Sequence, residues 1–370
     1  MLPDDAEGRC LAARRRAEGG PLTDDEVMAY LGWLADERMA DDPLDPPSYD
    51  WGCGGPVAGG SQMQVAREAA ALLRKRGGDA LARHLADRLR VPGDRVRAAR
   101  LAVELLGAAH PLVKATLTHG EPGAREAIAE GFARQPFLGP DAPPTLVLGL
   151  FDEREAVVRD VVAALDRAIG GSEQAVAALP PDAFARARHP DARIALAALT
   201  GRWGEAALTP ADCARVVARK AVSTPQIEAL LATQPDLAAP LLAAVRARFE
   251  AAPAGRRYEA TAQLAAFAPD AAAFALVLAE VRARSSAVDA AVCFVARAPA
   301  LLQPTIDALL AGMSEDQHTA LGVRALIRLD PKAFGAAFPR EQRARLRKVL
   351  RNLPNVLEAD TLLASLDAPA

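Results

Sequence analysis

The sequence predicts an all-α protein, organised as an α-solenoid in which short helices stack one behind another. Three observations support this fold class. The chain of 370 residues is 51% hydrophobic but only 4% aromatic, so its apolar volume consists mostly of alanine, leucine and valine, which favour closely packed helices. Long stretches with the period-two alternation typical of strands are lacking. Helical segments separated by Pro or Gly turns recur at intervals of roughly 30 residues, and such a spacing indicates a repeat array.

The clearest helix is predicted over residues 151–169. Acidic residues at its start suit the positive end of the helix dipole. Apolar residues then return every three to four positions, which places them on one face. This stripe comprises Val157, Val161, Ala164, Leu165 and Ile169. The rest of the chain contains weaker copies of this helix, each paired with a second helix.

Residues 1–60 are predicted to form an N-terminal cap. They carry 13 acidic and 5 basic side chains, against 34 acidic and 39 basic ones in the remainder. Thr23 and Glu26 have the spacing of a capping box that opens a helix, and a Pro- and Gly-rich stretch follows this helix. The region also holds two of the three Trp and two of the three Tyr residues. These aromatics either form a binding patch, for which Tyr49 and Trp51 are candidates, or close a small core over the first repeat.

Residues 61–370 are predicted to form the solenoid. A recurring element appears here, in which an Asp-, Pro- or Gly-containing turn is followed by a small residue, an arginine and an Ala-rich helix. Its arginines are Arg97, Arg125, Arg159 and Arg193, which are 28, 34 and 34 residues apart. A further 34 residues lead to Ile227, where the turn remains but the arginine does not.

This element resembles the second helix of HEAT repeats, in the short bacterial form that includes the phycobilin-lyase-like group. The landmarks of tetratricopeptide repeats, which have a similar period, do not recur at fixed offsets. The resemblance is best over residues 94–200 and becomes looser towards the C-terminal end. It implies antiparallel helical hairpins in which the arginine and the turn acid bridge neighbouring repeats. On this resemblance, the four recurring arginines have a structural role.

The sequence contains no pattern of residues that predicts catalysis. The five histidines include no HExxH motif, and the pair His84 and Asp87 has a spacing that arises often by chance. No GxSxG motif occurs, and Cys213 and Cys293 fall in expected helices, where cysteine is usually a small buried hydrophobe. The string WGC at residues 51–53 lacks a neighbouring base. We therefore expect no enzymatic activity, no bound metal and no cofactor.

The expected location is the cytoplasm. The first residues lack the charged region and apolar core of a secretory signal. The longest apolar run, residues 271–279, is about half of the ~20 residues that span a bilayer. The four cysteines form no CxxC pair, which is typical of reduced thiols in a cytosolic protein.

Two strings are candidates for nucleic-acid binding. Residues 339–352 predict a basic helix, whose one face carries Arg340, Arg343, Arg347 and Arg351. Its opposite, apolar stripe comprises Leu346, Val349, Leu350 and Leu353. The basic face either contacts phosphates or is the solvated outer face of the last repeats. The second string, Arg202-Trp203, is comparable to the basic and aromatic groups of HEAT-like DNA glycosylases.

The function predicted from the sequence is that of a non-catalytic scaffold, which binds a protein partner along the inner surface of its repeats. The alternative is a nucleic-acid-binding protein or a HEAT-like DNA glycosylase that uses a basic groove and the basic C-terminal helix. A lyase-like chaperone for a chromophore is a third hypothesis, and it requires a large apolar pocket.

Overall fold

The structure, a computed structural model, describes residues 6–38, 62–219, 221–253 and 257–366. Over these ranges the protein is all-α and contains no strand, which confirms the all-α part of the predicted fold. Leu138 and Ala168 form an isolated parallel bridge. The chain divides into two compact units, Met1–Ala192 and Arg193–Ala370. Within the ranges given, no helix is both long enough and apolar enough to cross a bilayer.

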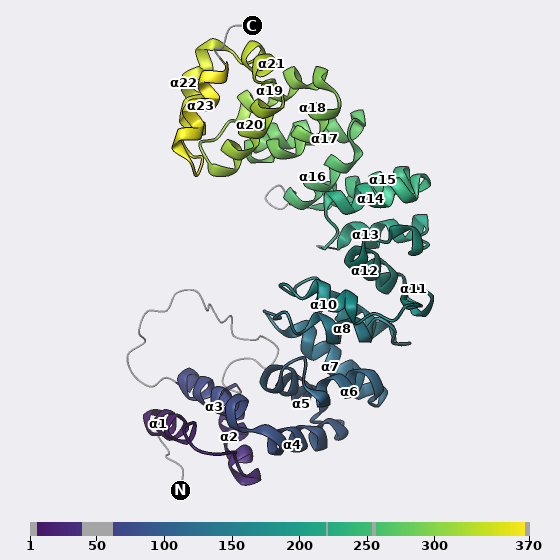
Figure 1. Cartoon of the computed structure of the whole chain (residues 1–370), viewed down its shortest axis with the longest axis vertical. Coiled ribbons are helices and arrows are strands. Elements are labelled where there is room, and N and C mark those ends of the chain that lie inside the picture. The colour runs from purple at the N-terminus through teal and green to yellow at the C-terminus, as the bar shows by residue number, and fades with distance from the viewer. Residues whose placement is uncertain (1–5, 39–61, 220, 254–256, 367–370) are drawn as a thin grey trace. The chain divides into compact units, whose positions relative to one another are not determined.

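The first unit consists of short helices that follow one another along the chain (Figure 1). They are α1 (Ala6–Arg16), α2 (Asp24–Arg38), α3 (Gln62–Arg76), α4 (Gly78–Arg90), α5 (Arg95–Leu101), the π-helical turn η1 (Ala102–Leu106), α6 (Pro111–His119), α7 (Pro122–Arg134), α8 (Pro143–Gly149), α9 (Glu155–Leu165), α10 (Ser172–Ala177) and α11 (Ala183–Arg186). Three of them, α6, α7 and α8, begin at a proline, whose missing N–H would be unpaired at that position anyway.

Alternate helices of the first unit pack against one another. α7 lies between α5 and α9, while α8 packs on both α6 and α10. Gly131 permits the close contact of α7 with α5, because a Cβ atom there would lie only 3.3 Å from the carbonyl of Ala99. Ile128, Phe132 and Val157 are fully buried. Each pair of helices therefore covers its apolar face with the next pair.

The helix predicted over residues 151–169 is shorter than expected, because α9 covers only Glu155–Leu165. Before its start, the Asp152 Oδ1 atom accepts a hydrogen bond from Arg154 N at 2.9 Å. Such a local bond to the backbone competes with helix formation. Val157, Val161 and Ala164 of the predicted stripe are buried as expected, and Leu165 is half-buried. The prediction is wrong for Ile169, which lies beyond the helix and is 68% exposed.

The N-terminal helices form a small core of their own in the first unit, where α1 and α2 pack on α3. Tyr30 and Trp33 are buried in it, with ring centroids 4.8 Å apart in an edge-to-face arrangement. The Arg9 guanidinium lies 5.5 Å from the centroid of the Trp33 ring. Of the four aromatics in the predicted cap, these two thus contribute to a local core. Tyr49 and Trp51 lie outside the described residues.

The second unit has the same construction from short helices (Figure 1). Its helices are α12 (Pro190–Thr200, which contains the unit boundary), η2 (Trp203–Glu205), η3 (Pro210–Asp212), α13 (Cys213–Ala218), α14 (Thr224–Thr233), η4 (Pro235–Leu237), α15 (Ala238–Ala251), α16 (Tyr258–Leu264), η6 (Ala265–Phe267), α17 (Ala271–Ala283), η7 (Ser285–Ala287), α18 (Val288–Arg297), η8 (Pro299–Leu301), α19 (Leu302–Gly312), α20 (Gln317–Leu329), α21 (Pro331–Ala337), η9 (Arg340–Gln342), α22 (Arg343–Leu350) and α23 (Val356–Leu366). The elements labelled η in this unit are single 3₁₀ turns, most of which lead directly into an α-helix.

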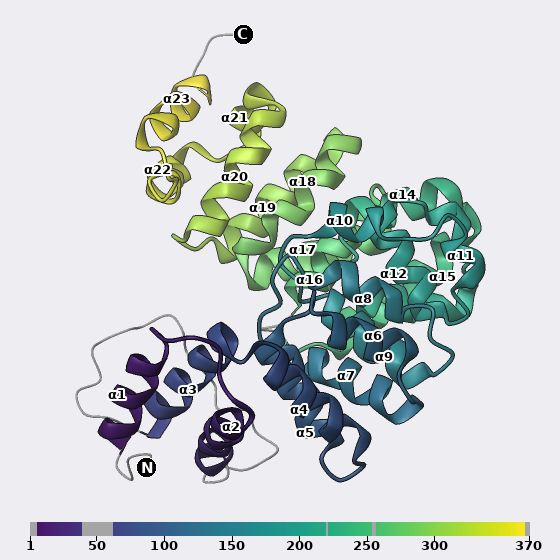
Figure 2. The ribbon, with the colours of Figure 1, turned by 60° about the horizontal axis from the view of Figure 1, so that its bottom comes forward.

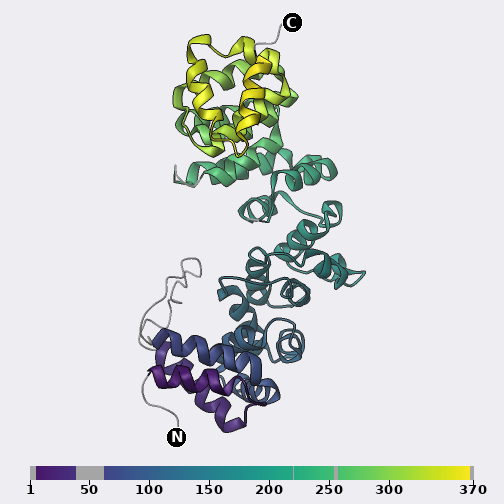
Figure 3. The ribbon, with the colours of Figure 1, turned by 60° about the vertical axis from the view of Figure 1, so that its left-hand side comes forward.

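Alternate helices also pack together in the second unit. One series runs α17, α19, α21 and α23, and the other runs α16, α18, α20 and α22 (Figure 2). Figure 3 shows this part of the chain, coloured green to yellow, from another side. Phe294, Phe334 and Phe338 are among the largest fully buried side chains of this region. The two series are joined by contacts such as those of α17 with α18 and of α20 with α21.

In both units, side chains from the next helix pair bind the carbonyl groups at helix ends. A helix leaves its last four carbonyls without an intrahelical partner. In the first unit, Arg167 donates to two carbonyls at the end of α7. In the second unit, Arg345 donates to carbonyls at the end of α19. Arg248 Nη1 donates to Val217 O, in the last turn of α13, at 2.6 Å. These donors lie 31 to 35 residues after their acceptors, so each helix pair completes the one before it.

The predicted capping box at the start of α2 is present and includes a further ion pair. Thr23 N donates to Glu26 Oε2 at 2.8 Å, and Glu26 N donates to Thr23 Oγ1 at 3.3 Å. Arg16 Nε donates to Glu26 Oε1 at 2.6 Å. The Arg16 guanidinium, and then the Thr23 N–H, lower the pKa of Glu26 from 4.5 to about 2.

We predict that Glu26→Gln makes the free energy of unfolding less dependent on pH. Because the folded-state pKa of Glu26 is depressed, its contribution is present above pH 4.5 and is lost as the pH falls towards about 2. The free energy of unfolding, measured by denaturant titration across this window, should fall less steeply for Glu26→Gln than for the wild type. Asp25→Asn, in the same helical turn, should retain the steeper fall. Equal slopes for Glu26→Gln and the wild type would contradict the assignment.

We also predict that Gly171→Ala destabilises the first unit more than Gly139→Ala does. Gly171 has φ 75° and ψ 7°, in the left-handed region, where alanine costs about 1–2 kcal/mol. A Cβ atom at Gly171 would in addition lie 2.2 Å from Pro140 O, whereas nothing lies within 4 Å of one at Gly139. Urea denaturation of the full chain compares the two losses of unfolding free energy. Equal losses would contradict the prediction.

Candidate functional site

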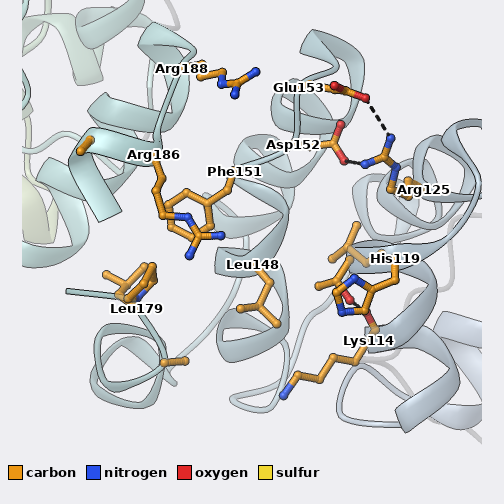
Figure 4. Close-up of a pocket in the computed structure, with 15 residues that line it drawn as sticks. Lys114, His119, Arg125, Leu148, Phe151, Asp152, Glu153, Leu179, Arg186 and Arg188 are labelled. Carbon is orange, nitrogen blue, oxygen red and sulfur yellow. Dashed lines mark hydrogen bonds and ion pairs between the residues drawn. The ribbon is translucent and has the colours of Figure 1, made fainter. Parts of the chain in front are cut away.

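A cleft of about 870 Å³ opens in the first unit (Figure 4). It is bounded by the C-terminal half of α6, the end of α8 with the turn that follows, and the segment from the end of α10 through α11 to Arg188. The last of these boundaries is irregular because Pro180 and Pro181 interrupt the helical pattern. The cleft therefore lies where two very short helices, α10 and α11, follow the longer helices of the unit.

The cleft has an apolar floor. Leu117 belongs to the buried face of α6, and Leu148 and Phe151 come from the end of α8 and the turn after it. Leu179 contributes from the opposite side (Figure 4). Leu148, Phe151 and Leu179 are half-buried, so part of their apolar surface faces the open space. An apolar group of a ligand would gain free energy by covering this surface.

Arg186 lies over the aromatic ring in this floor. Its guanidinium carbon is 5.0 Å from the centroid of the Phe151 ring (Figure 4). A cation at this distance from a ring face is attracted by the ring quadrupole. The contact holds an exposed arginine in place at the edge of the cleft.

A buried ion pair fixes the opposite side of the cleft. Arg125, on α7, contacts Asp152 Oδ2 at 3.0 Å and Glu153 Oε1 at 3.4 Å. The side chain of Asp152 is only 4% exposed, whereas that of Glu153 is 66% exposed. His189 Nε2 lies 3.2 Å from Glu153 O and ties the segment after α11 to the same turn. These contacts join three successive parts of the chain around the cleft.

Positive charge exceeds negative charge among the lining residues. The two carboxylates, Asp152 and Glu153, both contact Arg125. Within the described ranges, the other three cations, Lys114, Arg186 and Arg188, form no ion pair. All three are exposed, and they lie on different sides of the floor (Figure 4). The cleft is therefore suited to an anionic ligand that also carries an apolar group.

A second, smaller cleft of about 470 Å³ lies between α7 and α9 and has a different charge balance. Glu130 pairs with Arg134, and Asp160 pairs with Arg159. A further acid of its lining, Glu126, pairs with Arg154. Because its charges are paired with one another, this cleft offers less to a charged ligand than the first one.

The described part of the chain contains no group of three or more His, Cys, Asp or Glu side chains placed to hold a metal ion. The main cleft is lined by cations, apolar groups and one arginine–carboxylate cluster. Burial raises the pKa of the Cys213 and Cys293 thiols, which disfavours their reactive thiolate forms. The arrangement in the cleft can bind and orient a ligand through charge and apolar contact.

The four recurring arginines occupy different environments. Arg125 makes the bridge to a turn acid that the HEAT resemblance implies. Arg159 is 68% exposed and contacts the adjacent Asp160. Arg97 is exposed and Arg193 is half-buried. Their common structural role therefore stays a prediction, supported by direct contacts at Arg125.

The predicted binding residues of the second unit lie on elements that do not pack against each other, since Trp203 is on η2 whereas Arg343 and Arg347 are on α22. Trp203 is fully buried, so it belongs to the core in this structure, while Arg202 pairs with Glu205 on the surface. On the basic C-terminal helix, the apolar stripe is buried as predicted. Arg343 Nη2 donates to Gly335 O at 2.8 Å, which uses this arginine inside the unit. The exposed members of the predicted basic face are Arg340, Arg347 and Arg351.

No sequence pattern predicts the cleft. The helical pattern places Phe151 at the start of a long helix, and Lys114, Arg186 and Arg188 resemble ordinary exposed cations in the sequence. The available signal was local, namely two arginines in the string FARAR that follow a double proline. No family model, no curated protein and no solved structure matches the chain. The residues of the cleft are therefore the basis for a functional proposal.

We predict that the two carboxylates bound to Arg125 contribute unequally to stability. Asp152→Ala removes a buried partner and should destabilise the first unit by about 3 kcal/mol, because the buried guanidinium of Arg125 keeps only the exposed Glu153 as a partner. Glu153→Ala removes an exposed partner and should change the free energy of unfolding by less than about 1 kcal/mol. Asp152→Asn keeps the oxygen that accepts from Arg154 N but removes the negative charge. This variant therefore separates the contribution of the turn to stability from that of the ion pair. Similar losses for both alanine variants in urea denaturation would contradict this order.

Proposed function

We propose that the chain is a non-catalytic scaffold whose helical hairpins stack as a HEAT-like α-solenoid and which binds a protein partner. In support of the architecture, alternate helices pack together in each unit, and side chains from one pair of helices bind the carbonyls of the preceding pair. Stacked repeats of this kind offer extended surfaces for partners. We also propose a cytoplasmic location, which agrees with the reduced, undisulfided state of Cys213 and Cys293.

The observation that carries the binding role is the cleft of the first unit. It combines an apolar floor with exposed cations, and protein interfaces typically have an apolar centre with a polar rim. Arginine and aromatic residues, which are enriched at interface hot spots, meet there as Arg186 and Phe151. The walls are held by the Arg125–Asp152 pair, so the cleft is largely formed before a partner arrives.

Nucleic-acid binding is the second candidate function, and the exposed cations of α22 favour it. Arg347 and Lys348 on α22, and Arg351 directly after it, are exposed and could contact phosphates. Two facts weigh against it. Arg343 is used inside the unit, and Lys348 lies 4.0 Å from Glu315, which reduces the local positive charge.

The proposal is tested by affinity purification of the full chain from extract of its source cells, with and without nuclease. A protein should be retained in nuclease-treated extract by the wild type. It should be lost with the double variant Lys114→Glu/Arg188→Glu, because reversed charges at the cleft repel an anionic partner. Lys75→Glu, which reverses an exposed cation outside the cleft, should retain it. Recovery of nucleic acid alone, with nothing left after nuclease treatment, would favour the second candidate and defeat the scaffold.

A further inference from the structure

We propose that the cleft binds an acidic, extended segment of the partner protein that inserts one large aliphatic side chain between Leu148, Phe151 and Leu179. This inference rests on the proposed function and specifies the chemistry of the partner. It follows from three features of the cleft: the distribution of its charges, the state of its aromatic ring and the position of its own acids.

The distribution of charge selects an anionic ligand. Lys114, Arg186 and Arg188 are exposed and form no ion pair within the described part of the chain. Because they lie on different sides of the floor, a single small anion would not contact all three (Figure 4). A segment with several carboxylates would, and arginine binds carboxylates through two parallel hydrogen bonds. An extended acidic peptide matches this arrangement better than an isolated ion.

The apolar floor selects an aliphatic anchor. Leu148 and Leu179 are half-buried on either side of Phe151. The volume of about 870 Å³ falls in the usual range of about 300–1,000 Å³ for ligand pockets, and it accommodates a side chain with its flanking backbone. Covering this surface with a leucine-sized group removes apolar area from water on both sides.

One face of the aromatic ring is already covered and is not free to stack on a nucleobase. Proteins that bind single-stranded nucleic acids without sequence preference stack bases on free aromatic faces. In the cleft, the Arg186 guanidinium already lies over the Phe151 ring, 5.0 Å from its centroid. The edge of this guanidinium remains available to a carboxylate while its face stays on the ring. The stacking therefore favours a peptide acid over a base.

The exposed acid of the cleft, Glu153, also favours an acidic peptide over a nucleic acid. Glu153 is 66% exposed and would repel a regular row of phosphates that passed it. A peptide can place a neutral residue or a backbone N–H at that point and its acids near Lys114 and Arg188. Neutralising Glu153 should therefore strengthen binding of an oligonucleotide more than binding of an acidic peptide, an effect that loss of folding cannot imitate.

The test is fluorescence anisotropy of the full chain with labelled synthetic peptides. The main peptide has glutamates around one central leucine; the others replace the leucine by serine, or the glutamates by lysines. The glutamate–leucine peptide should bind, more weakly at high salt, and either replacement should weaken it by about tenfold or more. An oligonucleotide of similar length should bind less tightly than the main peptide. No binding of the main peptide, or tighter binding of the lysine peptide or the oligonucleotide, would overturn the inference.

Variants locate the binding in the cleft. Lys114→Glu/Arg188→Glu and Arg186→Ala should each weaken binding of the glutamate–leucine peptide by about tenfold or more. Glu153→Gln should reduce the preference for this peptide over the oligonucleotide, and Lys75→Glu, on an exposed part of α3 outside the cleft, should leave peptide binding unchanged. Unchanged affinity in the double variant would place the peptide elsewhere and overturn the inference. The two proposals fail separately. A partner that is retained from extract in a cleft-dependent manner, with no binding of the acidic peptide, would refute the acidic class alone.

Discussion

The constraint on which the structure depends is the pairing of carbonyl groups at the ends of many short helices. Each helix end exposes acceptors that must find donors, and a chain with so many helices has many such ends. Arg167, Arg248 and Arg345 supply donors from the following helix pair. A cation is also the favourable charge at a helix C-terminus. Stacking is thus directed by polar contacts as well as by burial of small apolar side chains.

The candidate site lies where this regular arrangement is interrupted. The segment from α10 to α11 forms only two very short helices and contains a double proline, so it borders the cleft without filling it. The neighbouring turn between α8 and α9 is held by Asp152, which pairs with Arg125 and also accepts from Arg154 N. One nearly buried carboxylate therefore sets both the start of a helix and one side of the cleft.

Local sequence patterns predicted the elements better than they predicted the site. The all-α class, the capping box at Thr23 and the apolar stripe of the C-terminal basic helix depend on neighbours within a few residues, and these predictions are confirmed. Phe151 was placed in a helix because its sequence neighbours favour one. Its actual position depends on Asp152 and on Arg125, 27 residues away from that acid in the chain. Such long-range contacts leave no periodic signal, and neither does the meeting of Phe151 with Arg186.

The stacking of Arg186 on Phe151 has a consequence for the energetics of recognition. A free arginine on a surface samples many rotamers, and immobilising such a side chain on association costs about 0.5–1.5 kcal/mol. At this position the ring restricts the guanidinium while the site is still empty of partner. Much of that conformational entropy is therefore lost during folding, and the side chain is preorganised when two molecules meet.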